Sequence, residues 1–123
     1  MASLAGRARV RCQLPFIASD ASEPEPDVAV VPVADYRQAH PDRAFLIVEV
    51  ANSSHKVDHL KADLYAAAAV PEYWIVDVPG RSIEVRTDPV NGTYATMRTY
   101  RKGDTVALAT FPDVTVAVDA VVG

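Results

Sequence analysis

The sequence predicts an α/β (α+β) fold, a mixed β-sheet with one main crossover helix packed on it. A nearly unbroken apolar run at residues 44–51 is typical of a strand that is buried on both faces of a sheet. Only residues 56–69 repeat apolar positions at helical spacing, whereas several short segments alternate with a strand period. The 123 residues suffice for one domain with a core, so residues 1–123 are expected to form a single domain.

Three strands are expected before the helix. In residues 7–17 apolar and polar side chains alternate, and in residues 27–33 a short buried strand ends or moves to a sheet edge at Pro32. Residues 44–51, AFLIVEVA, form the strongest strand. The polar, proline-containing stretches between these strands are expected to be loops: residues 18–27 and 34–43.

The helix and the elements after it complete the predicted order β-β-β-α-β-β-β. In the helix, apolar side chains recur at Val57, Leu60, Leu64 and Ala68 (or Ala67). Residues 70–78 follow as a strand, and residues 79–104 as two strands joined by an Asn91-Gly92 turn. Residues 105–123 are expected to add short terminal strands and a final helical turn.

Composition excludes several classes of protein. The net charge of −4 argues against a protein that coats nucleic acid by bulk charge, although a local basic cleft remains compatible with it. No apolar run approaches 18 residues, so neither a transmembrane helix nor a membrane partner is expected. A single cysteine, Cys12, excludes an internal disulfide framework and fits a reducing compartment, which predicts a cytoplasmic location.

Glu49 stands in the middle of the most apolar strand, where an unpartnered carboxylate would cost several kcal/mol. Side chains alternate along a strand, so Glu49 shares a face with Ile47 and Ala51, and Asp27 shares one with Ala29. If the two strands are neighbours, Asp27 and Glu49 point into the same volume and repel each other unless a cation joins them. Oxygen ligands of this kind select hard cations such as Mg²⁺ or Mn²⁺.

Lys61 lies on the helix face that also carries Tyr65 and is expected to meet the sheet. A lysine there needs an acidic or phosphate partner. Together, Asp27, Glu49 and Lys61 are suited to metal-assisted hydrolysis of phosphodiesters, in which the lysine orients the attacking water or steadies developing charge.

Four segments carry a resemblance to a known family: EPDVAVV, FLIVEVANSS, KADLYAAAAVPEYWIVD and RKGDTVALATFPDVTVAVDAVV. In order and spacing they resemble the Uma-type putative restriction endonuclease family of bacteria, a branch of the PD-(D/E)XK nuclease superfamily. The resemblance covers roughly residues 10–122 and is most specific from Glu49 through Asp77. It implies a restriction-endonuclease-like fold, a Mg²⁺ or Mn²⁺ cofactor, and DNA as the substrate of a metal-dependent endonuclease.

The resemblance also implies roles for individual residues. Asp27, after Pro26, and Glu49 match the two acidic metal ligands, and the backbone carbonyl of Val50 matches a third. The superfamily's lysine stands two residues past the glutamate, where this chain has Ala51. Lys61 instead matches the helix lysine of Uma-type proteins, which precedes a tyrosine by four residues. The implied catalytic residues are therefore Asp27, Glu49 and Lys61.

Two departures from the family pattern affect these expectations. The family usually carries an aspartate four residues before the helix lysine, whereas here Val57 occupies that position and Asp58 lies one residue later. Longer members begin with a helical and hairpin segment that contributes an acidic residue to the site, and we expect this segment to be absent from the present chain. A homodimer is expected to cover the surface exposed by its absence.

Other interpretations of the same residues stay open. Glu49 could form a structural ion pair with Arg43 or Arg11, and Lys61 could extend along the helix into water. The arginines at positions 7, 9 and 11 either touch phosphates or lie on an exposed strand face. Two functions therefore compete with the endonuclease: a catalytically weak or inactive nuclease fold that acts as a binding or regulatory module, and an interaction protein with no nucleic-acid role.

Overall fold

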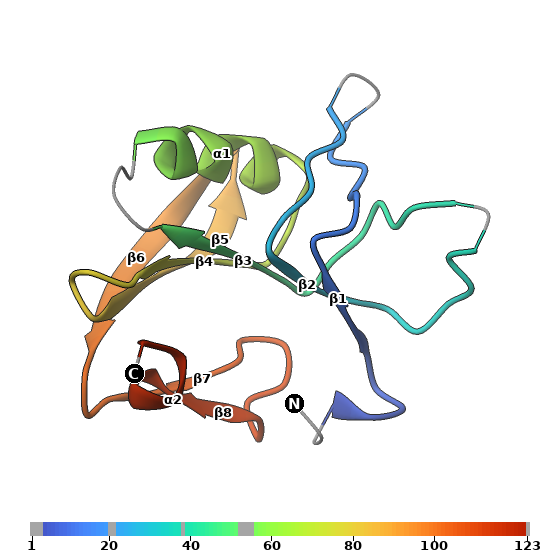
Figure 1. The fold of residues 1–123 in the computed structure, drawn as a ribbon. Coiled ribbons are helices and arrows are strands. Elements are labelled where there is room, and N and C mark those ends of the chain that lie inside the picture. Colours follow the sequence, from blue (N-terminus) through green and yellow to red (C-terminus); the bar gives the residue numbers. More distant parts are fainter. Residues whose placement is uncertain (1–3, 20–21, 38, 52–55, 123) are drawn as a thin grey trace.

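The computed structural model describes residues 4–19, 22–37, 39–51 and 56–122, with the side chains of residues 56–60 outside the description. Three layers are visible in Figure 1, where helix α1 (Lys56–Ala67) covers one face of a curved sheet. A β-hairpin and the short helix α2 (Val118–Val122) cover the other face. In these ranges no helix is both long and apolar enough to cross a membrane.

The main sheet has six strands in the order β1-β2-β3-β4-β5-β6. Only β3 and β4 run parallel, and α1 is the crossover that joins them, as parallel neighbours require. This arrangement confirms the predicted mixed α+β fold. The strands are β1 (Arg9–Cys12), β2 (Val28–Val31), β3 (Leu46–Ala51), β4 (Glu72–Asp77), β5 (Ser82–Val90) and β6 (Thr93–Arg101), and the hairpin on the other face comprises β7 (Thr105–Ala107) and β8 (Thr115–Ala117).

The first strand is shorter than the sequence predicts. The alternation in residues 7–17 predicts one strand over the whole segment, yet β1 spans only Arg9–Cys12. Gln13 has a φ of 52°, a left-handed conformation that an extended strand does not accommodate. Its N–H still donates to the carbonyl of Asp27 (3.1 Å), so the chain stays beside β2 for one residue and then turns away.

Two hydrophobic cores lie on opposite faces of the sheet. On the α1 side, Tyr65 and Tyr73 are the largest buried side chains. Of the helix side chains that the structure describes, Ala62, Tyr65 and Ala66 are buried there, whereas Leu64 and Ala68 are half-buried. Val57 and Leu60 of the predicted apolar stripe lie outside the described side chains. Small alanines let this part of the helix approach the sheet closely, while one tyrosine fills the remaining space.

Shortly after the end of α1 the chain passes through a left-handed residue, Ala69, with a φ of 60°. The N–H of Val70 donates to the carbonyl of Tyr65, as in a helix end that usually contains glycine. We expect Ala69→Gly to raise the free energy of unfolding by about 1 kcal/mol, because glycine adopts this conformation without a Cβ clash. Thermal unfolding measures the change, with Ala67→Gly at the last residue of the helix as the control, which should destabilise the protein. An unchanged or lower melting temperature for Ala69→Gly would show that the left-handed conformation does not strain the backbone at Ala69.

Candidate active site

Asp27 and Glu49 lie side by side on the α1 face of the sheet. Strands β2 and β3 are antiparallel with Val28 opposite Val48, which places Asp27, the residue before β2, next to Glu49. The backbone N–H of Asp27 donates to Oε1 of Glu49 (3.0 Å), and the N–H of Val50 donates to Oδ2 of Asp27 (2.7 Å). Each acid is thus held by backbone from the other's strand.

Glu49 is 3% exposed and is surrounded by hydrogen-bond donors. Its Oε1 accepts the Asp27 N–H, and its Oε2 accepts from the Lys61 ammonium (2.9 Å) and the Tyr65 hydroxyl (3.4 Å). A buried carboxylate is tolerated when it is paired and hydrogen-bonded, and Glu49 meets both conditions. These contacts explain how an acid is accommodated inside the most apolar strand.

Lys61 reaches Glu49 from α1, and its side chain is 35% exposed. Its ammonium therefore contacts the carboxylate, in contrast to the interpretation in which it extends into water. The alternative ion pair between Glu49 and Arg11 is wrong, because the Arg11 guanidinium lies over the Tyr36 ring and contacts His40. The structure thus brings all three predicted catalytic residues, Asp27, Glu49 and Lys61, into one cluster. Their chemical roles stay predictions.

Tyr65 is a member of this cluster that the residue pattern alone left without a role. Its side chain is fully buried and packs against the rings of Phe16 (6.3 Å between centroids) and Tyr73 (5.1 Å). Burial raises the pKa of the Tyr65 phenol far above its ordinary value, and the negative charge of Glu49 raises it further. The hydroxyl therefore keeps its proton, which it can donate in a hydrogen bond to Glu49. The only sequence signal was its position four residues after Lys61.

The donor set fits a hard divalent cation. Oδ1 of Asp27 accepts no hydrogen bond from the residues that the structure describes, and it belongs to a half-buried side chain. The N–H of Val50 points toward Asp27, and the carbonyl of a strand residue points to the same side as its N–H. Across the described ranges, no third His, Cys, Asp or Glu joins the two acids. Mg²⁺ is commonly held by one or two carboxylates while it keeps several waters, so two acids and a carbonyl suit it.

The mixed sheet, its single crossover helix and the acid pair on the helix face define a restriction-endonuclease-like protein. The family model for Uma2, putative restriction endonuclease, matches residues 2–119, and the chain belongs to this family. The resemblance noted in the sequence is thereby confirmed.

A solved structure agrees on the fold. A putative nuclease belonging to DUF820 from Anabaena variabilis superposes with a TM-score of 0.74 at 12% sequence identity. The match covers 98% of this chain and 72% of that one. The search of curated proteins gave no significant match.

Proposed function

We propose that this protein is a divalent-metal-dependent endonuclease that hydrolyses phosphodiester bonds in DNA. The observation that carries the proposal is the cluster of Asp27, Glu49 and Lys61, in which two carboxylates and an ammonium converge on one face of the sheet. Membership in a family described as putative restriction endonucleases supports a nuclease and, as its substrate, DNA.

In this proposal Asp27, Glu49 and the carbonyl of Val50 hold a Mg²⁺ or Mn²⁺ ion. Such an ion would supply positive charge beside the scissile phosphate and would lower the pKa of a nearby water molecule. The N–H groups of Asp27 and Val50 fix the two carboxylates, so the ligands need little reorganisation when the ion arrives. Lys61 donates hydrogen bonds to the water or to the negative oxygens that form during hydrolysis.

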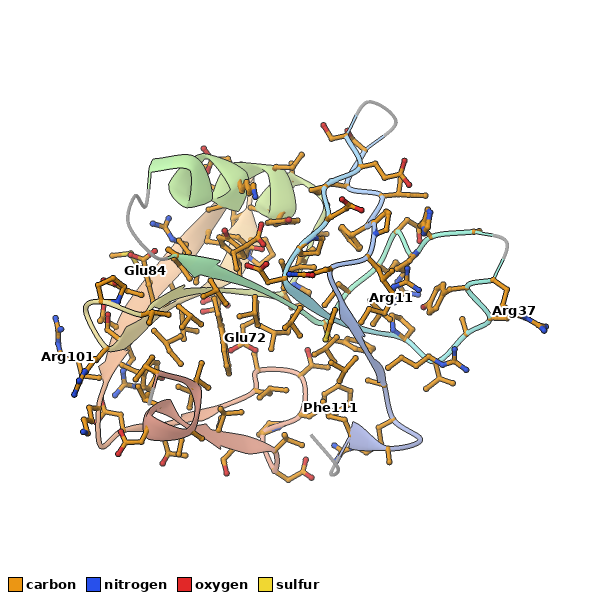
Figure 2. All side chains as sticks on the ribbon, viewed as in Figure 1. Arg11, Arg37, Glu72, Glu84, Arg101 and Phe111 are labelled. Atoms are coloured by element: carbon orange, nitrogen blue, oxygen red, sulfur yellow. The ribbon has the colours of Figure 1, made fainter. Side chains whose placement is uncertain are left out.

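Positive charge for the DNA backbone is available on the same sheet face. On β1, Arg11 pairs with Ala29 of β2 and Arg9 with Val31, two positions that share a face with Asp27. Figure 2 shows Arg11 beside the loop between β2 and β3. Arg7 instead makes a bidentate pair with Asp113 (2.7 and 2.9 Å), so it ties the chain's start to the β7–β8 loop. Arg9 and Arg11 are therefore the proposed phosphate contacts.

Titration of Mn²⁺ into the pure protein, followed by a plasmid-nicking assay, tests the proposal. We expect saturable binding of Mn²⁺ and nicking that requires Mg²⁺ or Mn²⁺ and stops when EDTA is added. Nicking should weaken steeply as salt is raised, because phosphate contacts release counterions. Metal binding without cleavage would favour the inactive binding module, and the absence of any metal binding would end the nuclease proposal. The homodimer and the cytoplasmic location stay predictions.

A further inference from the structure

The lone pairs of Glu49 are already heavily used. A carboxylate offers about four acceptor positions. Oε1 accepts the Asp27 N–H, while Oε2 accepts both the Lys61 ammonium and the Tyr65 hydroxyl. About one acceptor position remains, on Oε1; a cation that ligates Oε1 would lie only a few ångströms from the ammonium, and one that ligates Oε2 would have to share that oxygen with the ammonium, 2.9 Å away. Two positive charges so close together repel each other strongly in a partly buried site.

We propose that the Lys61 ammonium takes the place of the divalent cation on Glu49 when no cation is bound, and that cation binding displaces it from Oε2. This inference rests on the proposed function. The displaced ammonium then lies next to the cation site, where it can donate to water or phosphate. Lys61 is thus available for the reaction only after the cation has bound.

Two features of the cluster favour an exchange of partners. The Lys61 side chain is 35% exposed, and its ammonium is carried on a long flexible stem, so the ammonium can move toward solvent. Glu49 cannot follow, because its carboxylate is buried and held by the Asp27 N–H and the Tyr65 hydroxyl. Tyr65 is neutral and does not repel a cation. It acts as a positioning residue that keeps the carboxylate in place during the exchange.

The decisive experiment measures Mn²⁺ affinity of the full chain by calorimetry or by the paramagnetic resonance of unbound Mn²⁺. We expect Lys61→Met to tighten Mn²⁺ binding by about 10-fold or more, since a unit charge a few ångströms from the ion is removed. The same variant should cleave DNA more slowly than the parent protein. General structural damage would weaken metal binding, so tighter binding with slower cleavage is specific to this inference.

Three matched variants sharpen the result. Lys102→Met makes the same change in net charge at an exposed turn and should leave Mn²⁺ affinity within about twofold. Lys61→Arg keeps a charged donor and should not tighten binding. Tyr65→Phe removes a neutral donor from the same oxygen and should also not tighten it, because it removes no positive charge.

Displacement itself can be observed in the parent protein. The chain has three lysines, so the ammonium signal of Lys61 can be assigned in nitrogen-15 spectra with the Lys61→Arg variant. Mg²⁺ should shift that signal and leave that of Lys102 unchanged. An unmoved Lys61 signal at saturating Mg²⁺, or equal or weaker Mn²⁺ binding by Lys61→Met, would overturn the inference while the proposed metal site stands. If neither the parent protein nor Lys61→Met binds Mn²⁺, the proposed function itself fails.

Discussion

Asp27→Asn and Glu49→Gln are each expected to reduce divalent-dependent DNA cleavage by at least about 100-fold. Each substitution removes a negative oxygen ligand while it keeps the size of the side chain. Asp27→Asn is the more specific test of the two, because its amide oxygen can still accept the hydrogen bond that the Val50 N–H donates to Oδ2 in the parent protein. Initial rates of plasmid nicking in saturating Mg²⁺ measure the loss.

The control for this experiment is Asp63→Asn, which removes one negative charge from the exposed side of α1. It should cleave DNA at the parent rate. Circular dichroism and thermal unfolding should show that Asp27→Asn retains the parent fold. Cleavage by Asp27→Asn at the parent rate would show that the acid pair is not the nuclease site, whatever the activity of the parent protein.

The fold can be predicted from the sequence because the patterns that indicate its main elements are local. The apolar run around Glu49, the Asn91-Gly92 turn and the helical spacing of residues 56–69 each reflect one element's own geometry. At the hairpin, Asn91 and Gly92 both have positive φ, as the tight turn between β5 and β6 requires. The early end of β1 could not be predicted, since nothing in the residue type of Gln13 indicates a left-handed backbone.

The cluster at Glu49 could be predicted from the sequence for a related reason. Strand alternation puts Asp27 and Glu49 on definite faces, and a single assumption, that β2 and β3 are neighbours, brings them together. Hydrogen bonds of Tyr65 and Glu72 depend instead on packing between distant elements. The phenol of Tyr65 meets Glu49 only because small alanines bring α1 close to the sheet, and Glu72 meets a segment 37 residues away in sequence. Helical spacing places Tyr65 on the face of Lys61, but no periodic pattern specifies which distant residue either side chain contacts.

Glu72, at the start of β4, is 1% exposed and joins the sheet to the layer opposite α1. One carboxylate oxygen accepts the indole N–H of Trp74 (2.9 Å), and the other accepts the backbone N–H of Ala109 (2.9 Å), just after β7. Figure 2 shows Glu72 between the sheet and that layer. Residues 72–77, EYWIVD, combine ionisable and aromatic side chains but are typical of core and a strand end, and the contacts of Glu72 are those of a structural tie.

We expect Glu72→Ala to lower the free energy of unfolding by about 2–5 kcal/mol, because two buried N–H donors lose their acceptor. That is a large share of the roughly 5–15 kcal/mol that stabilises a domain. Urea unfolding of the parent and variant proteins measures the loss. Glu72→Gln serves as the matched variant: its amide oxygen can still accept one of the two hydrogen bonds, so it should lose less. Equal stability of Glu72→Ala and the parent would show that Glu72 does not tie the layers together.

The pH dependence of stability provides a second test of Glu72. Burial raises the pKa of this carboxyl above its ordinary value, and the hydrogen bonds from Ala109 and Trp74 only partly offset the rise. Between the ordinary and the raised pKa, the folded state holds a proton that the unfolded state has released. The stability of the parent relative to Glu72→Gln should therefore fall as pH rises through that window and become constant above it. Urea unfolding at a series of pH values measures the difference, and a difference that grows in the parent's favour with rising pH would contradict a raised pKa.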